Sequence, residues 1–207
     1  MAEAVRAFFA VKVDSDTSVC TEAREVAKAL RGRCERLRRS SNRTLEARWV
    51  GEESWHLTLR FLGDIAVAQI GDLARQVRTA LASVASFELR LGCAMTFPPK
   101  RPRTLALEVA PHAPLVGLAG AVEQGVVACG FKPEGRSFKP HLTLARIKDG
   151  HFRESDAEGV AAEGKARLPV DEIVLFRSEL RPSGAHYTPL ERIALQGRAA
   201  QGGHVYP

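Results

Sequence analysis

The tetrapeptide His-Leu-Thr-Leu occurs twice in this chain, beginning at His56 and again at His141. Side chains alternate between the two faces of a β-strand, so a strand places His56 and Thr58 on one face and the leucines on the other. The second copy does the same with His141 and Thr143. The repeat therefore predicts two strands, each with one polar and one apolar face. If a pseudo-two-fold axis relates the copies, their polar faces meet across a central cleft.

Two histidines and two threonines on facing strands suit acid–base chemistry on a phosphodiester. A neutral imidazole can remove a proton from the nucleophile while a protonated imidazole supports the leaving oxygen, and an ordinary pKa near ~6.5 makes both forms accessible. Threonine hydroxyls can donate to the non-bridging oxygens. A single His-x-Thr strand would usually be structural, but the duplication favours a function. The residues alone leave open which histidine is the acid.

No metal and no other cofactor are expected, since the sequence has neither a His-Glu-x-x-His motif nor a cluster of acidic ligands. The cysteines lack CxxC spacing, and most are expected to be buried thiols. They are Cys20, Cys34, Cys93 and Cys129. Four histidines lack the motif context and are expected on the surface or in turns: His112, His151, His186 and His204.

Length and composition favour one folded unit. The 207 residues are 45% hydrophobic and 26% charged, which excludes disordered and fibrous classes. The chain begins without a secretory signal, and no apolar run reaches transmembrane length, so we expect a cytoplasmic protein that does not contact the membrane.

The basic residues are unevenly distributed. The net charge is +6, and many arginines fall in one stretch of the first quarter of the chain. This stretch contains Arg31, Arg33, Arg36, Arg38, Arg39, Arg43 and Arg48. A second group contains Lys100, Arg101 and Arg103. Each of these residues could simply lie on a solvated face, but together they suit a phosphate backbone.

Apolar periodicity predicts a mixture of helices and strands. Helical spacing of three and four residues predicts helices over 19–37, 70–84 and 115–129. Strands are expected over 6–13, 47–50, 55–62, 87–91, 104–109, 173–180 and 186–195, and at the second motif. Because several strands are joined by short turns, we expect an α+β fold with antiparallel sheets. Residues 1–195 are expected to form a single bilobed unit, and 196–207 a flexible tail.

The expected bilobed unit has two pseudo-symmetric lobes. Each lobe would contain an antiparallel sheet with helices on the outside, and the motifs would face a central cleft. By strict alternation, Arg60 continues the polar face of the first motif and Phe61 lies on its core face.

Longer segments around the motifs resemble a known family. Trp55–Gly63, Phe138–Arg146, Phe97–Arg103 and Ser178–Gly184 resemble the bacterial RNA 2′,3′-cyclic phosphodiesterases. These enzymes belong to the two-histidine phosphoesterase superfamily and are also called 2′-5′ RNA ligases. The likeness extends over nearly the whole chain to about residue 195.

The resemblance implies that the protein hydrolyses a 2′,3′-cyclic phosphate at an RNA end and leaves a 2′-phosphate. It further implies that His56 protonates the departing 3′ oxygen and that His141 activates water. Thr58 and Thr143 would grip the phosphate.

Three further residues are expected to contact the substrate. The resemblance implies that Arg146 binds the phosphate and that Phe138 walls the nucleotide site. Arg60 is expected to bind substrate from the polar face. Strict alternation puts Arg146 on the leucine face, so its predicted role requires a bulge or strand end after Leu144.

Other functions remain open from the sequence. A 5′-hydroxyl could attack in place of water, which would make the reaction a ligation. The substrate could instead be a small cyclic-phosphate nucleotide or a 2′-5′ oligonucleotide, or the chain could be a non-catalytic RNA-binding module. The expected partner is RNA with a 2′,3′-cyclic phosphate end, with tRNA fragments among the candidates, and the protein is expected to be a monomer.

Overall fold

The computed structural model describes residues 3–40, 45–98, 102–150, 152–181 and 184–197. Most of the predicted tail, residues 198–207, therefore lies outside the described residues. The first half contains β1 (Ala4–Lys12), α1 (Ser18–Ser40), β2 (Leu45–Trp49), η1 (Glu52–Ser54), β3 (His56–Ala66), η2 (Val67–Gln69) and α2 (Ile70–Ala80). The second half contains β4 (Phe87–Phe97), β5 (Thr104–Ala110), α3 (His112–Ala128), β6 (His141–Gly150), η3 (Glu154–Asp156), β7 (Leu168–Val170), β8 (Glu172–Arg181) and β9 (Gly184–Ala194).

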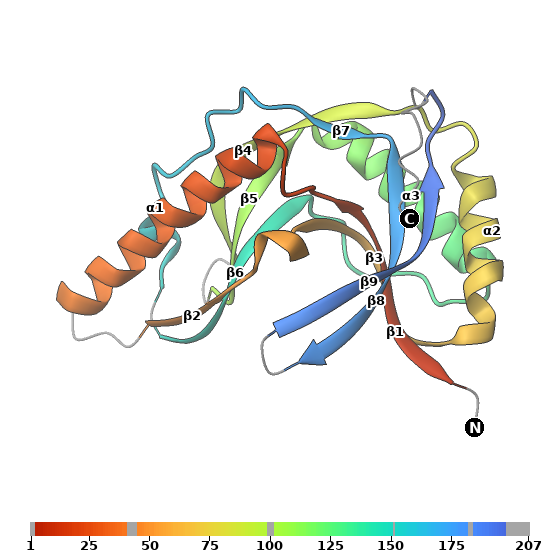
Figure 1. The fold of residues 1–207 in the computed structure, drawn as a ribbon, viewed down its shortest axis with the longest axis horizontal. Helices are drawn as coiled ribbons and strands as arrows, with labels where there is room; N and C mark the ends of the chain where they lie inside the picture. Colours follow the sequence, from red (N-terminus) through yellow and green to blue (C-terminus); the bar gives the residue numbers. More distant parts are fainter. Residues whose placement is uncertain (1–2, 41–44, 99–101, 151, 182–183, 198–207) are drawn as a thin grey trace, which may run out of the picture.

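The strands form two sheets in which neighbouring strands run antiparallel. One sheet has the order β3-β1-β8-β9, and the other has the order β2-β6-β5-β4-β7 (Figure 1). The predicted α+β fold with antiparallel sheets is confirmed. The first motif begins β3 and the second begins β6, so each sheet carries one copy.

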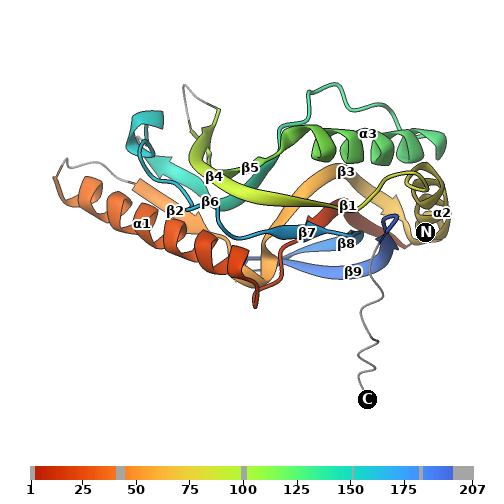
Figure 2. The same ribbon diagram turned by 90° about the horizontal axis from the view of Figure 1, so that it is seen from above.

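The helices exchange sheets between the two halves of the chain. Helix α1 follows β1 of the four-stranded sheet but packs on the five-stranded sheet, against β2 and β4. Helix α3 follows β5 of the five-stranded sheet but packs against β3 and α2, while α2 contacts β9 (Figure 2). One helix thus covers the five-stranded sheet and two cover the other. The predicted symmetry of the lobes remains a prediction.

The helices form where the apolar stripes predicted them, because those stripes fill the core. In α1, Val19, Ala23 and Leu30 are fully buried. Helices α2 and α3 approach closely at Gly125, where an added Cβ would lie 2.6 Å from the Cα of Val77. A single continuous cluster of buried side chains extends from α1 through both sheets to α2 and α3.

Both motif strands contain a bulge at the same place. In β3, Thr58 pairs with Ala10 and Arg60 with Phe9, so Leu59 is an extra residue. In β6, the residues on either side of Leu144 pair with consecutive residues of β5, so Leu144 is an extra residue too. An extra residue reverses which face the following side chains occupy.

The bulge corrects the predicted faces after the first motif. Phe61 is 51% exposed and lies on the side of His56, not in the core. The Arg60 side chain is only 12% exposed and is directed to α3, where its guanidinium pairs with Glu123. The prediction that Arg60 continues the polar face is therefore wrong. Strict alternation failed here because it assumes an unbroken ladder. In β6, the register shift at Leu144 is the bulge that the predicted role of Arg146 required.

Candidate active site

A cavity of about 420 Å³ lies between the two sheets. The four-stranded sheet contributes His56, Phe61 and Tyr187 to its lining, and the five-stranded sheet contributes Thr143 and Arg146. Val50 and Gly51, which precede η1, and Glu53 and Ser54 of η1 also line it. The sequence repeat is thus split between the two sides of one cavity.

The backbone holds His56 in one tautomer. Its Nδ1 lies 2.8 Å from the carbonyl oxygen of Ser54, the last residue of η1. A carbonyl oxygen can only accept, so Nδ1 carries the hydrogen and Nε2 is left for proton transfer. The ring packs against Phe8, with centroids 4.9 Å apart, and meets Tyr187 edge-on at 5.0 Å.

His141 is held in the same way. Its Nδ1 lies 2.7 Å from the carbonyl oxygen of Lys139, again two residues earlier in the chain. Its ring lies 5.0 Å from that of Phe97. Both histidines therefore present Nε2 as the free ring nitrogen, which is the arrangement that a pair of proton-transfer groups requires.

Both imidazoles are neutral near pH 7. Burial lowers the pKa of His56 to about 4, and the charges of Arg146 and His141 act in the same direction. Burial also lowers the pKa of His141, and the charge of Arg146 lowers it further. The hydrogen bond from each Nδ1 to a backbone carbonyl opposes these shifts without cancelling them. Arg146 is thus close enough to influence both histidines, and an anion beside it would raise both pKa values.

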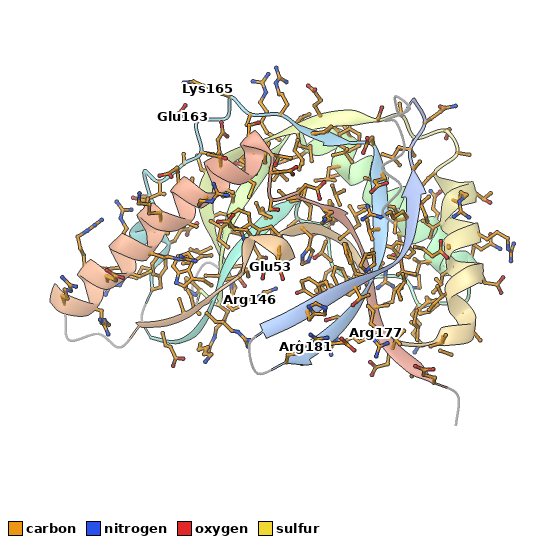
Figure 3. All side chains as sticks on the ribbon, in the orientation of Figure 1. Glu53, Arg146, Glu163, Lys165, Arg177 and Arg181 are labelled. Atoms are coloured by element: carbon orange, nitrogen blue, oxygen red, sulfur yellow. The ribbon has the colours of Figure 1, made fainter. Side chains whose placement is uncertain are left out.

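The charges in the cavity are predominantly positive. Arg6, Arg48 and Arg146 line it together with one carboxylate, Glu53, and Figure 3 shows Glu53 and Arg146 at the centre of the molecule. A guanidinium nitrogen of Arg146 donates to Oγ1 of the buried Thr104, at 2.9 Å. Three guanidinium groups and one carboxylate favour an anionic ligand.

Gly184 leaves space for the side chain of Arg48. Arg48 is opposite Arg146 in the pairing of β2 with β6. Gly184, at the start of β9, has φ +146°, and an added Cβ there would lie 3.0 Å from a terminal nitrogen of Arg48. The hairpin of the four-stranded sheet therefore leaves room for an arginine of the other sheet.

The cavity brings together only some of the predicted site residues. His56, Thr143 and Arg146 line it, whereas His141, Thr58, Arg60 and Phe138 do not. His141 is near enough for its charge to lower the pKa of His56.

The residues away from the cavity have other environments. Thr58 is half-buried, and its neighbours in the strand follow the alternation up to the bulge. Phe138 packs against the core. The guanidinium of Arg60 donates to the carbonyl oxygens of Phe61 and Lys132, in addition to its ion pair with Glu123.

Sequence reasoning missed several residues that line the cavity. Tyr187 comes from β9, more than 40 residues from either motif, and no pattern in the sequence links it to His56. Phe61 was assigned to the core. Arg6 was missed as well, because alternation does not say which face of a strand meets the other sheet. Arg48 was named only as one member of the basic stretch, and its place in the cavity was not predicted.

The remaining sequence predictions have mixed outcomes. Cys20 is buried, Cys34 and Cys129 are half-buried and Cys93 is exposed, so the prediction that most of the cysteines are buried is wrong. His112 is on the surface beside Glu108, while His151 lies outside the described residues. His204 also lies outside them. Within the described ranges no group of three or more His, Cys, Asp or Glu could hold a metal ion. No described helix is long and apolar enough to cross a membrane.

Two antiparallel sheets, each with a His-x-Thr strand whose histidine is anchored through Nδ1, define a two-histidine phosphoesterase. The chain belongs to the 2′-5′ RNA ligase superfamily, whose family model matches residues 21–182. The family predicted from the motifs is confirmed.

Individual relatives match over almost their full length. An RNA 2′,3′-cyclic phosphodiesterase of Methanothermobacter thermautotrophicus is 30% identical over 192 residues, which are 90% of this chain and 97% of the relative. One from Aeropyrum pernix is 32% identical over 183 residues, covering 84% and 99%. The crystal structure of Escherichia coli LigT with 3′-AMP has a TM-score of 0.70 and 26% identity, and the match covers 94% of this chain and 99% of LigT.

Proposed function

We propose that this protein hydrolyses the 2′,3′-cyclic phosphate at an RNA end to a 2′-phosphate, without a metal ion. The observation that carries the proposal is the matched pair of imidazoles: each has Nδ1 bound to a backbone carbonyl, and each is influenced by the same arginine. Two relatives that match over most of their length are named RNA 2′,3′-cyclic phosphodiesterases.

In the proposed reaction, Arg146 and the hydroxyls of Thr58 and Thr143 donate to the non-bridging oxygens of the cyclic phosphate. Nε2 of neutral His141 takes a proton from water as the water oxygen attacks phosphorus. The bond from phosphorus to O3′ breaks, and protonated His56 donates its Nε2 proton to O3′. The products are a 2′-phosphate and a free 3′-hydroxyl. The His141 proton then leaves to solvent and His56 is reprotonated.

Substrate binding supplies the conditions for this proton transfer. In the free protein, burial and Arg146 hold His56 neutral at pH 7. A bound phosphodiester brings a negative charge beside Arg146 and raises the pKa of His56. Binding is therefore coupled to proton uptake. The assignment of His56 as acid and His141 as base comes from the resemblance to the family.

Ligation would use the same groups with another nucleophile. A 5′-hydroxyl that replaced water would lose its proton to His141, attack phosphorus and leave a 2′-5′ phosphodiester, again with proton donation from His56 to O3′. The arginine lining is also compatible with a small cyclic-phosphate nucleotide, a 2′-5′ oligonucleotide, or RNA binding without turnover. The paired imidazoles favour catalysis over binding alone, since charge recognition does not require them.

The test is turnover of an oligonucleotide with a 2′,3′-cyclic end in the presence of EDTA. The proposal expects a 2′-phosphate product, and a loss of about 10² to 10⁴ in rate for His56→Ala and for His141→Ala. His112→Ala is the matched control, because His112 is exposed and outside the cavity. Absence of product, or full activity in both motif variants, would refute it. Binding that survives in the double variant while turnover is lost separates catalysis from recognition.

We also propose that residues 1–195 act as a single bilobed, monomeric unit in the cytoplasm, on RNA ends such as those of tRNA fragments. Light scattering at increasing protein concentration tests the monomer, since a mass that rises above one chain contradicts it. Recovery of cyclic-ended tRNA fragments bound to the His56→Ala, His141→Ala double variant in cells tests the substrate.

A further inference from the structure

One face of α1 carries a row of charged side chains, three basic and one acidic. Lys28, Arg31, Glu35 and Arg38 follow one another at spacings of three, four and three residues, so they share one side of the helix. All four side chains are exposed. At 1.5 Å per residue the row is about 15 Å long. We call these four residues the α1 stripe.

The α1 stripe begins beside the cavity. The guanidinium of Arg31 lies over the ring of Trp49, 4.8 Å from its centroid, and Trp49 lines the cavity. One turn earlier than Lys28, Arg24 makes two 2.7 Å hydrogen bonds to Glu52 of η1, whose other two residues, Glu53 and Ser54, line the cavity. This side of α1 therefore faces β2 and η1. In Figures 1 and 2, α1 and β2 run side by side away from the centre of the molecule.

The basic groups of the α1 stripe are available to a ligand. Among the described residues, Arg24 of α1 forms an ion pair with Glu52, whereas Lys28 and Arg38 form none. Arg31 stacks on Trp49, and its charge also acts on Glu52. Glu35 is the only acid in the stripe. Exposed cations in a row along a helix suit successive phosphates, because counterions leave the nucleic acid when basic side chains neutralise its phosphates.

We propose that the α1 stripe binds the RNA strand on the 5′ side of its cyclic phosphate end. This inference rests on the proposed function. With the terminal phosphate beside Arg146, the strand leaves the cavity past Trp49 and Arg31, and its phosphates follow the stripe toward Arg38. The planar guanidinium of Arg31, held over Trp49 at the exit, suits a nucleic acid better than an acidic peptide, because a base can stack on a guanidinium plane.

The proposal predicts a preference for length. A mononucleotide in the cavity cannot also reach along the 15 Å of the stripe. An oligonucleotide can do both, so the stripe contributes to its binding and not to that of a mononucleotide. The cavity then determines the chemistry at the end, and α1 selects a substrate that has a chain attached.

Comparison of two substrates tests the stripe. The measured quantity is the ratio of kcat/KM for a ten-nucleotide RNA with a cyclic end to kcat/KM for 2′,3′-cyclic AMP. We expect Arg31→Ala/Arg38→Ala to lower this ratio about tenfold and Glu35→Gln to raise it about twofold. The matched control is Arg75→Ala/Arg78→Ala on α2, at the other end of the molecule (Figure 1), which removes the same charge and should leave the ratio unchanged.

A ratio that does not fall in the stripe variant, or falls equally in the α2 control, would overturn the proposal. A direct binding assay keeps this result separate from failure of the proposed function. Fluorescence anisotropy of a non-hydrolysable RNA, measured over a range of NaCl concentrations, requires no turnover. Loss of two single-strand phosphate contacts should reduce the slope of log Kd against log salt by about 1.4. An unchanged slope, or equally tight binding of poly-glutamate, would also contradict RNA recognition by the stripe.

Discussion

Phe61 and Arg146 occupy the same position in the two copies of the repeated strand. Each is the fifth residue after the motif histidine, each follows a bulge at the second motif leucine, and both side chains line the cavity. The counterpart of Arg60 is instead Ala145, and both of these side chains are turned away from the cavity. The repeat thus places an aromatic ring on one wall and a cation on the other. A nucleotide has an aromatic base at one end and an anionic phosphate at the other, so the aromatic Phe61 is complementary to the base and the cationic Arg146 to the phosphate.

Arg146→Ala should lower kcat/KM by about 10² to 10³, because it removes a positioned donor to the phosphate. Arg146→Lys should restore little, since an ammonium cannot replace the planar fork that also donates to Thr104. Steady-state kinetics with a cyclic-ended oligonucleotide measures both. Arg136→Ala is the control: Arg136 is an exposed loop residue, and this variant should retain wild-type activity. A wild-type kcat/KM in the Arg146→Ala protein would show that Arg146 does not bind the phosphate.

Phe61→Ala should impair substrate binding more than stability. The ring is half-exposed and contacts Phe8 at 5.8 Å between centroids, so its loss should cost at most about 1 kcal/mol of unfolding free energy. Phe9→Ala, in the adjacent strand but fully buried, should cost about 3 to 5 kcal/mol. Urea denaturation measures both, and KM for the oligonucleotide should rise only for Phe61→Ala among the folded variants. An unchanged KM would show that the exposed ring does not contact the substrate.

The protonation of His56 should depend on the anion in the cavity. In the free protein its pKa is about 4, below the ordinary value near 6.5, so it is neutral at pH 7. Added phosphate should raise this pKa by offsetting Arg146, whereas Arg146→Ala should raise it without phosphate. Histidine NMR titration measures both shifts.

The depressed pKa of His56 also makes the stability of the protein depend on pH. Between about pH 6.5 and 4 the unfolded chain gains this proton and the folded protein does not, so the free energy of unfolding falls as the pH drops through this range. Below about pH 4 the contribution of His56 no longer changes. His56→Gln should remove that part of the pH dependence.

Packing between α2 and α3 predicts opposite effects for glycines of the same helix. Gly125→Ala should destabilise the protein by about 1 to 3 kcal/mol, because the new methyl group would collide with the backbone of Val77. Gly117→Ala and Gly120→Ala have open space at the new methyl group and should stabilise the helix by about 0.5 to 1 kcal/mol. Thermal and denaturant unfolding distinguish the three variants. A stable Gly125→Ala protein would mean that the helices can separate without loss.

Local sequence patterns predicted those features that depend on nearby residues. Alternation correctly placed His56 and Thr143 on the strand faces that line the cavity, because up to the bulge it depends only on the strand itself. It failed at Arg60 and Phe61, because a bulge is settled by the register with β1, which the motif does not contain. The packing of Tyr187 on His56 could not be predicted for the same reason. Contacts between strands that are far apart in sequence depend on the strand order of the whole sheet, which no local pattern contains.

The order of strands in the four-stranded sheet has a consequence for biosynthesis. Strand β1 lies between β3, which follows it closely in the chain, and β8, which is translated much later. His56 is therefore translated long before Tyr187, the aromatic ring that meets it edge-on. A nascent chain that still lacks β8 and β9 carries both motif histidines but has an open sheet edge along β1 and no wall opposite β2. The cavity can therefore be completed only after β9 has been translated.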